Sequence, residues 1–238
     1  MATNFAWSYS RLSSHEKCAH RYGHQYVWKT PFIDEAGPPL IHGRRVHGGM
    51  AAYLLGGENG TFYAEQDKIT YKAEMRLEAK KIGHFSALIE DVRANQPVVE
   101  QQWGYTELYR PTSWFGKDTY WRVILDAGVL WPDNKFSCID WKTGRAYEDN
   151  ADQMRQFAVG VFSRYPQVHW LETRLEYLDT GQEQHEEFRR SDVPSLVADF
   201  ARRVGPIEND KTFAPRPGSH CRFCPFRKNG GTGHCEFS

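Results

Sequence analysis

The chain has 238 residues, with 30 basic and 30 acidic side chains and 40% hydrophobic residues, a composition typical of a soluble globular protein. No apolar run approaches the roughly 20 residues of a membrane span, and the segment MATNFAWSYS lacks the basic and apolar regions of a signal peptide. A cytoplasmic protein is therefore expected, and the balanced charge excludes one that coats nucleic acid by charge alone.

Hydrophobic periodicity and breaker residues predict a mixture of helices and strands. Helices are predicted over residues 8–28, 43–55, 64–94, 150–164 and 193–204, and strands over 98–109, both arms of 121–143, and 168–178. An antiparallel hairpin combined with a strand that follows a crossover helix indicates a mixed sheet. We therefore predict an α/β fold with a mixed β-sheet flanked by helices.

The hairpin WRVILDAGVLWPDNKFSCIDWKT, residues 121–143, is the most informative stretch of the chain. Folding it about Asp133, in a Pro-Asp-Asn turn, places Asp126 opposite Asp140. Facing Cβ atoms are roughly 4.5–5.5 Å apart, and like charges there repel. Lys142 shares the face of Asp140 because strand side chains alternate. A divalent cation between the two carboxylates would explain this pattern and suits phosphodiester cleavage.

The alternative is a solvated strand face, where D-x-K triplets are common, and a register slip of one residue would separate the two acids. Neighbouring elements supply further polar residues. His47 opens the second helix and could bind a metal or contact a phosphate, although a lone helical histidine is more often structural. Glu100 could reach the same site from the first strand. Gln153 and Phe157 share a helix face, and Gln153 could contact substrate or steady the metal site while Phe157 packs.

Five cysteines without a secretion signal favour metal ligands, catalytic groups or core residues over disulfides. Cys221 and Cys224 form a C-x2-C pair, and Cys235 follows after ten residues. Three thiolates leave a four-coordinate site one ligand short, and Cys18 could complete it. Four thiolates suit an iron–sulfur cluster or zinc.

The alternative for this tail is a zinc site in which three thiols are joined by His220 or His234, with Cys18 buried and unliganded. Cys138 lies in an apolar strand and is predicted to be a core residue.

Taken together, these segments resemble the PD-(D/E)XK nuclease superfamily, and in particular the RecB-like exonucleases that carry an iron–sulfur cluster. Such enzymes include CRISPR-associated and helicase-linked nucleases. The resemblance runs from Ser8 to Cys235 and rests on six segments in the same order. They are SYSRLSSHEKCAHRYGHQYV, GRRVH, ILD, IDWKTG, QMRQF and FAPRPGSHCRFCPF.

The resemblance implies roles for individual residues. Catalytic roles fall to Asp126, Asp140, Lys142 and Gln153, and Mg²⁺ or Mn²⁺ would be held by His47, Asp126, Asp140 and the carbonyl of Trp141. A [4Fe-4S] cluster, or zinc in its place, would be held by Cys18, Cys221, Cys224 and Cys235. The chain departs from the family pattern at Val123, where a glycine is common, at Phe157, where tyrosine is usual, and in the long gap before Cys235.

The resemblance also implies a restriction-endonuclease-like core within one integrated domain. Residues 1–95 would form a helical N-terminal part, 96–205 the nuclease core, and 206–238 a Cys-rich tail that packs on the N-terminal helix.

The expected activity is that of a metal-dependent DNA exonuclease that acts on DNA ends or single strands in repair, recombination, phage or CRISPR-associated processes. The alternatives are an inactive DNA- or partner-binding module of this fold and a structure- or sequence-specific endonuclease. DNA is the expected partner, and a homo-oligomer or a recombination or replication protein could join it.

Overall fold

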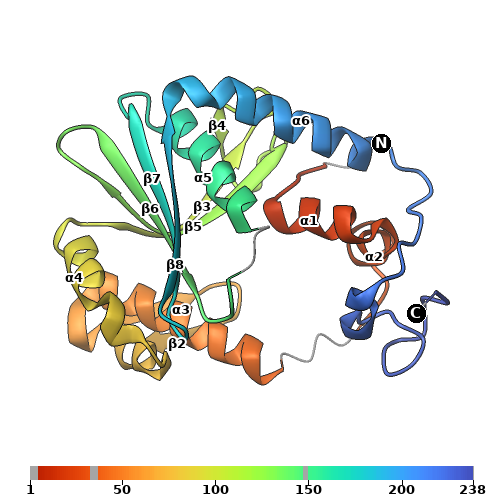
Figure 1. Cartoon of the computed structure of the whole chain (residues 1–238), viewed down its shortest axis with the longest axis horizontal. Helices are drawn as coiled ribbons and strands as arrows, with labels where there is room; N and C mark the ends of the chain where they lie inside the picture. The colour runs from red at the N-terminus through yellow and green to blue at the C-terminus, as the bar shows by residue number, and fades with distance from the viewer. Residues whose placement is uncertain (1–4, 33–36, 147–149, 238) are drawn as a thin grey trace. The chain divides into compact units, whose positions relative to one another are not determined.

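The computed structural model describes residues 5–32, 37–146 and 150–237 (Figure 1). The chain divides into two compact units. One comprises Ala36–Val197, and the other combines Met1–Glu35 with Ala198–Ser238. None of the described helices is long and apolar enough to cross a bilayer.

A six-stranded mixed sheet forms the larger unit, in the spatial order β4-β3-β5-β6-β7-β8. Its strands are β3 (Val98–Tyr105), β4 (Pro111–Thr112), β5 (Trp121–Leu130), β6 (Lys135–Lys142), β7 (Trp170–Tyr177) and β8 (Gln182–Arg189). Only β6 and β7 pair in parallel, through the crossover helix α5 (Ala151–Arg164). The predicted α/β fold with a mixed sheet and flanking helices is confirmed.

The β5–β6 hairpin has the predicted register. The strands pair from Leu130–Phe136 at the turn to Ala127–Ile139, and this alignment leads to Asp126 opposite Asp140. Beyond the last pair, the backbone N–H of Trp141 donates a 2.9 Å hydrogen bond to the Asp126 carboxylate. The carboxylate of Asp126 thus replaces a backbone carbonyl as the hydrogen-bond acceptor at the point where the two strands stop pairing.

Helices cover both faces of the sheet, as alternation along β6 shows. Ile139 and Trp141 pack into an apolar cluster with α3 (Pro38–Gly56) and α4 (Ser86–Ala94). Asp140 and Lys142, which alternate with these two residues along β6, instead contact Gln153 on α5. Because alternate strand residues point to opposite faces, α3 and α5 lie on opposite sides of β6.

The predicted helix over 64–94 is wrong in its first part. Residues Thr61–Ala64 (β1) and Ile69–Lys72 (β2) form a separate antiparallel hairpin, and the 3-10 turns Ala73–Glu78 and Ile82–Phe85 precede α4. Aromatic and β-branched residues in TFYA and ITYK favour strands, although the surrounding segment is rich in Ala, Glu and Lys. Strand β8 was missed because it is an edge strand with mostly polar residues, QEQHEEFR.

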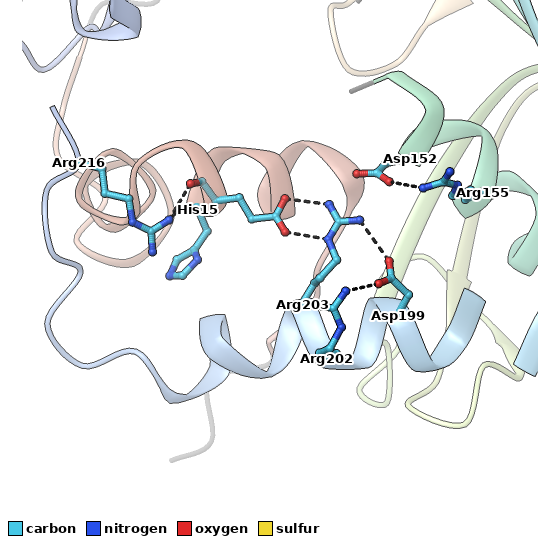
Figure 2. A network of polar contacts seen from close by, with 8 residues as sticks. His15, Asp152, Arg155, Asp199, Arg202, Arg203 and Arg216 are labelled. Carbon is cyan, nitrogen blue, oxygen red and sulfur yellow. Dashed lines mark hydrogen bonds and ion pairs between the residues drawn. The ribbon is translucent and has the colours of Figure 1, made fainter. Parts of the chain in front are cut away.

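The smaller unit contains α1 (Tyr9–Lys17), α2 (Ala19–Tyr22), the π-turn Gly23–Val27, most of α6 (Val193–Asn209) and the turn Ser219–Phe223. The predicted helix over 8–28 is thus interrupted at Cys18, whose backbone is extended. Arg203 links the two chain ends in this unit, because its guanidinium donates to both Glu16 carboxylate oxygens at 2.8 and 2.9 Å. Arg203 also contacts Asp199 (Figure 2). Arg216 donates a 2.6 Å hydrogen bond to the backbone carbonyl of Glu16.

Asp210 ties the first helix to the tail. One of its oxygens lies 2.9 Å from His15 Nε2, and the other accepts the backbone N–H groups of Thr212 and Phe213. Burial alone would raise the pKa of Asp210, but these hydrogen bonds lower it to about 2.

We expect Asp210→Asn to lower the free energy of unfolding at neutral pH by about 2 kcal/mol, the amount linked to such a pKa shift. The stabilisation by the carboxylate is complete above its unfolded pKa of about 4 and is lost as the pH falls through its folded pKa of about 2. Melting temperatures of the two proteins should therefore differ at pH 7 and converge towards pH 2. A constant difference over this range would contradict the assignment.

Candidate active site

Among the described residues, three from α3, β3 and β5 form a group of potential metal ligands. The ligand atoms of His47, Glu100 and Asp126 all lie within 4.8 Å of one another. His47 Nδ1 is 3.1 Å from the same Asp126 oxygen that accepts the Trp141 N–H. Two carboxylates and an imidazole are suitable ligands for Mn²⁺, and the carboxylates also suit Mg²⁺.

Glu100 enters this group through an unusual backbone conformation. Its φ angle is 49°, in the left-handed region that non-glycine residues rarely adopt. The flanking positions Val99 and Gln101 pair regularly with Ala127 and Leu125 on β5. Such conformations cost of order 1–3 kcal/mol and are concentrated at functional sites. The sequence predicts only that Glu100 could reach the site. The alternation of residues along the strand does not predict this backbone distortion.

His47 is held by the close approach of α3 to β2. The next residue, Gly48, faces the buried ring of Tyr71, and a Cβ atom at Gly48 would lie 2.1 Å from that ring. Only glycine permits this packing without displacement of the helix or the ring. The segment HGRRVHGG therefore allows the helix that carries the imidazole to pack unusually close to the β1–β2 hairpin.

We expect Gly48→Ala to lower the free energy of unfolding by about 1–3 kcal/mol, the cost of an overpacked core. It should also weaken divalent-metal binding, because the adjacent His47 moves with the helix. Chemical denaturation and Mn²⁺ titration would measure both effects. The matched control is Gly83→Ala, where a Cβ atom meets nothing within 4 Å. Equal stability of the two variants would contradict the packing argument.

A second group lies on the α5 side of β6. Lys142 forms an ion pair with Asp140 and donates a 2.8 Å hydrogen bond to Gln153 Oε1. The Gln153 amide in turn donates to Asp140 Oδ1 at 2.6 Å. The three side chains form a closed triangle that holds the ammonium group in one orientation.

The two groups interact electrostatically. Burial, together with the charge of Asp126, raises the pKa of Asp140 to about 6 and that of Glu100 to about 8. Burial would lower the pKa of His47, but Asp126 and the other two acids raise it to about 9. Burial alone would raise the pKa of Asp126, but the charges of His47 and Lys142 lower it below its usual value. Two buried acids and the half-buried Glu100, which interact through their charges, form a site that favours a divalent cation.

The remaining residues named from the sequence near this site lie in the interior. Phe157 and Cys138 are fully buried, as predicted for packing residues, and Val123 is buried on β5. The side chain of Trp141 is also buried, and its backbone N–H is the group that contacts Asp126. A ligand role for its carbonyl stays a prediction.

The four predicted cluster cysteines all belong to the smaller unit. Cys18, Cys224 and Cys235 are buried, and Cys221 is half-buried. Burial raises the pKa of Cys224, and the nearby thiols of Cys235 and Cys18 raise it further. The backbone of Gly218 donates to Cys221 Sγ at 3.4 Å.

The chain folds back across the ten-residue gap, because the N–H of Cys235 donates to the carbonyl of Phe226 at 2.8 Å. Within residues 5–32 and 198–237, no three cysteine sulfurs lie within 4.8 Å of one another. Zinc–sulfur bonds of about 2.3 Å would bring tetrahedral ligands to about 3.8 Å from one another. In these two segments no three of the thiols therefore have the mutual spacing of ligands of a single zinc ion.

The fold is similar to a protein of Eubacterium rectale named as a candidate exonuclease, with a TM-score of 0.52 and 12% identity over 94% of this chain and 88% of that one. The protein SSO0001 gives a TM-score of 0.40 at 14% identity, over 95% of this chain and 85% of that one. No curated protein matches the chain. The family model for the PD-(D/E)XK nuclease superfamily matches residues 6–228, so the chain belongs to this superfamily.

Proposed function

We propose that the protein is a metal-dependent exonuclease that hydrolyses phosphodiester bonds of DNA at ends or in single strands. The observation that carries the proposal is the meeting of two groups at one end of the β5–β6 hairpin. One is the metal-ligand group of His47, Glu100 and Asp126, and the other is the triangle that holds Lys142. Membership of the nuclease superfamily supports the reaction class, and the fold of the named relative supports the exonuclease assignment only by analogy.

Mg²⁺ or Mn²⁺ would be held by Asp126, Glu100 and His47, with Asp140 and the Trp141 carbonyl as further ligands. When bound, such an ion polarises a phosphate and lowers the pKa of a coordinated water. Asp126 is prepared for this role because the Trp141 N–H fixes one of its oxygens.

Lys142 would stabilise the negative charge that develops on the phosphate during cleavage. Burial lowers the pKa of Lys142, but Asp140 and Asp126 more than reverse this effect, so the ammonium remains protonated. It therefore acts as a cation and hydrogen-bond donor and not as a base. Gln153 holds both Lys142 and Asp140 and is a positioning residue.

The test uses labelled linear and circular DNA, single- and double-stranded, incubated with Mn²⁺, Mg²⁺ or EDTA. An exonuclease requires an end, so linear DNA should be degraded with either metal while circular DNA survives. The Lys142→Ala protein, prepared in parallel, detects contaminating nucleases. Cleavage of circles would favour the endonuclease alternative. Binding without any cleavage would favour the inactive binding module.

We infer that Cys18, Cys221, Cys224 and Cys235 hold a [4Fe-4S] cluster that stabilises the smaller unit. The thiols of Cys18 and Cys235 lie near enough to raise the pKa of Cys224, which supports one shared centre, and each thiolate of a cluster would bind a different iron. The N–H group directed at Cys221 Sγ is typical of the hydrogen bonds that tune such clusters.

Anaerobically purified protein should be brown, with a broad absorbance band near about 400 nm. Cys224→Ser should lose the colour and most of the iron, whereas Cys138→Ala, at a buried cysteine of the other unit, should keep both. Colourless protein that contains zinc would contradict the cluster.

A further inference from the structure

A solvent-accessible strip of the sheet leads away from the metal-ligand group. Gln102 on β3 and Ile124 on β5 pair across the two strands and line the same cavity, of about 450 Å³, as His47 and Glu100. Ile124 is 38% exposed, although it lies in the middle of a central strand. Arg122 follows two residues along β5 and therefore lies on the same face as Ile124.

The strip ends at a cluster of two aromatic rings and one cation. The Arg122 guanidinium carbon lies 5.4 Å from the ring centre of Trp114 and 5.5 Å from that of Phe115. Arg122 Nε also donates to the Trp114 carbonyl at 2.9 Å, which holds the side chain beside both rings. Phe115 is 83% exposed. We refer to Trp114, Phe115 and Arg122 as the aromatic platform.

The loop that carries both rings is held firmly by its own hydrogen bonds. Thr119 Oγ1 donates to the Ser113 carbonyl at 2.8 Å, and Thr112 Oγ1 donates to Asp118 at 2.8 Å. The loop also packs directly on β3, where a Cβ atom at Gly104 would lie 2.4 Å from the Ser113 carbonyl oxygen. Because the loop is already ordered, binding to the exposed phenyl ring costs little backbone entropy.

The distance from this platform to the metal-ligand group suits a nucleic-acid strand. Asp126 lies four positions after Arg122 on β5, which corresponds to roughly 13 Å along a strand. Exposed rings stack on unpaired bases, and a guanidinium beside them can bind phosphate. The faces of bases within a duplex are already covered by neighbouring bases, so aromatic rings that stack on bases bind a duplex much more weakly.

We propose that the aromatic platform binds single-stranded DNA a few nucleotides from the bond that is cleaved, and so selects unpaired over paired substrate. The proposal rests on the proposed nuclease function and deepens it, since it names the substrate class and the residues that recognise it. The strand would lie over Ile124 and Gln102, between the platform and the metal-ligand group. Lys117 and Asp118 on the same loop are both exposed and carry opposite charges, so Arg122 supplies the positive charge of the platform.

Binding is measured in protein that carries Lys142→Ala, so that cleavage does not interfere. The probes are fluorescein-labelled single-stranded oligothymidylate and a blunt duplex of equal length, followed by anisotropy with Mn²⁺. Phe115→Ala combined with Trp114→Ala should weaken single-strand binding about tenfold or more, since each stacked base contributes about 1–3 kcal/mol. Duplex binding should change little. Arg122→Gln should weaken single-strand binding and reduce its salt dependence.

The matched control is Trp170→Ala. Trp170 on β7 also lies beside two cations, Lys135 and Arg189, but is not part of the cavity lining or the strip. This variant should bind both probes like the parent protein. Unchanged single-strand binding in the Phe115 and Trp114 double variant would overturn the proposal, as would an equal loss for the duplex. Failure of the nuclease function would appear separately, as absence of cleavage by protein with Lys142 intact.

Discussion

Lys142→Ala is expected to reduce DNA cleavage at least about 100-fold, the effect of removing one donor that stabilises a transition state. Lys142 lies beside Asp140, the acid of β6, and its ion pair with Asp140 and hydrogen bond to Gln153 fix its position. Loss of the ammonium removes the charge that would balance the developing phosphate oxyanion. Circular dichroism should show an unchanged fold, because Asp140 keeps its hydrogen bond from Gln153 and its raised pKa favours protonation when the ammonium is removed.

The matched control lies on the same strand. Lys135→Ala removes an ammonium that is 45% exposed and paired with Asp133 at 2.7 Å, so cleavage should be unaffected. Single-turnover rates on labelled linear DNA in Mn²⁺ would compare the three proteins. Wild-type turnover by Lys142→Ala would refute the catalytic role. An equal loss in Lys135→Ala would indicate a general charge effect.

Asp126→Asn is expected to weaken Mn²⁺ binding by more than about 100-fold, a larger effect than the loss of a residue outside the ligand shell. The amide keeps an oxygen to accept the Trp141 N–H, so the hairpin should remain intact. The substitution removes only the negative charge at the centre of the group with His47 and Glu100. Isothermal calorimetry with Mn²⁺ measures the affinity directly.

Asp140→Asn provides the comparison. Asp140 is held by Lys142 and Gln153 and lies outside the tight group of His47, Glu100 and Asp126, so its loss should weaken Mn²⁺ binding less, by about 10–100-fold. Both variants should lose cleavage. Unchanged Mn²⁺ affinity in Asp126→Asn, or a greater loss in Asp140→Asn, would contradict the assignment of the primary ligand group.

Much of the site was predictable from the sequence because its key residues lie close together along the chain. A Pro-Asp-Asn turn and two apolar arms set the β5–β6 register, and strand alternation places Asp140 and Lys142 on one face. The helix that follows carries Gln153 back to the same strand end, where its side chain contacts both Asp140 and Lys142.

Other features depend on contacts between distant parts of the chain. Glu100 reaches the metal-ligand group only because its backbone adopts a left-handed conformation, which no local pattern indicates. The aromatic platform likewise depends on the pairing of β3 with β5 and on the loop that packs against Gly104. In the sequence, Trp114 and Phe115 are two aromatic residues in an ordinary loop.

By itself, the sequence determined the α/β class, the register of the central hairpin and the residues that could carry the chemistry, because these follow from periodicity, turn residues and spacing over short distances. Only the tertiary structure decided which acids share one point. The meeting of His47, Glu100 and Asp126 depends on how closely α3 packs on the β1–β2 hairpin and on where β3 departs from regular geometry. Both are set by the packing of side chains far apart in the chain, which one-dimensional patterns do not contain.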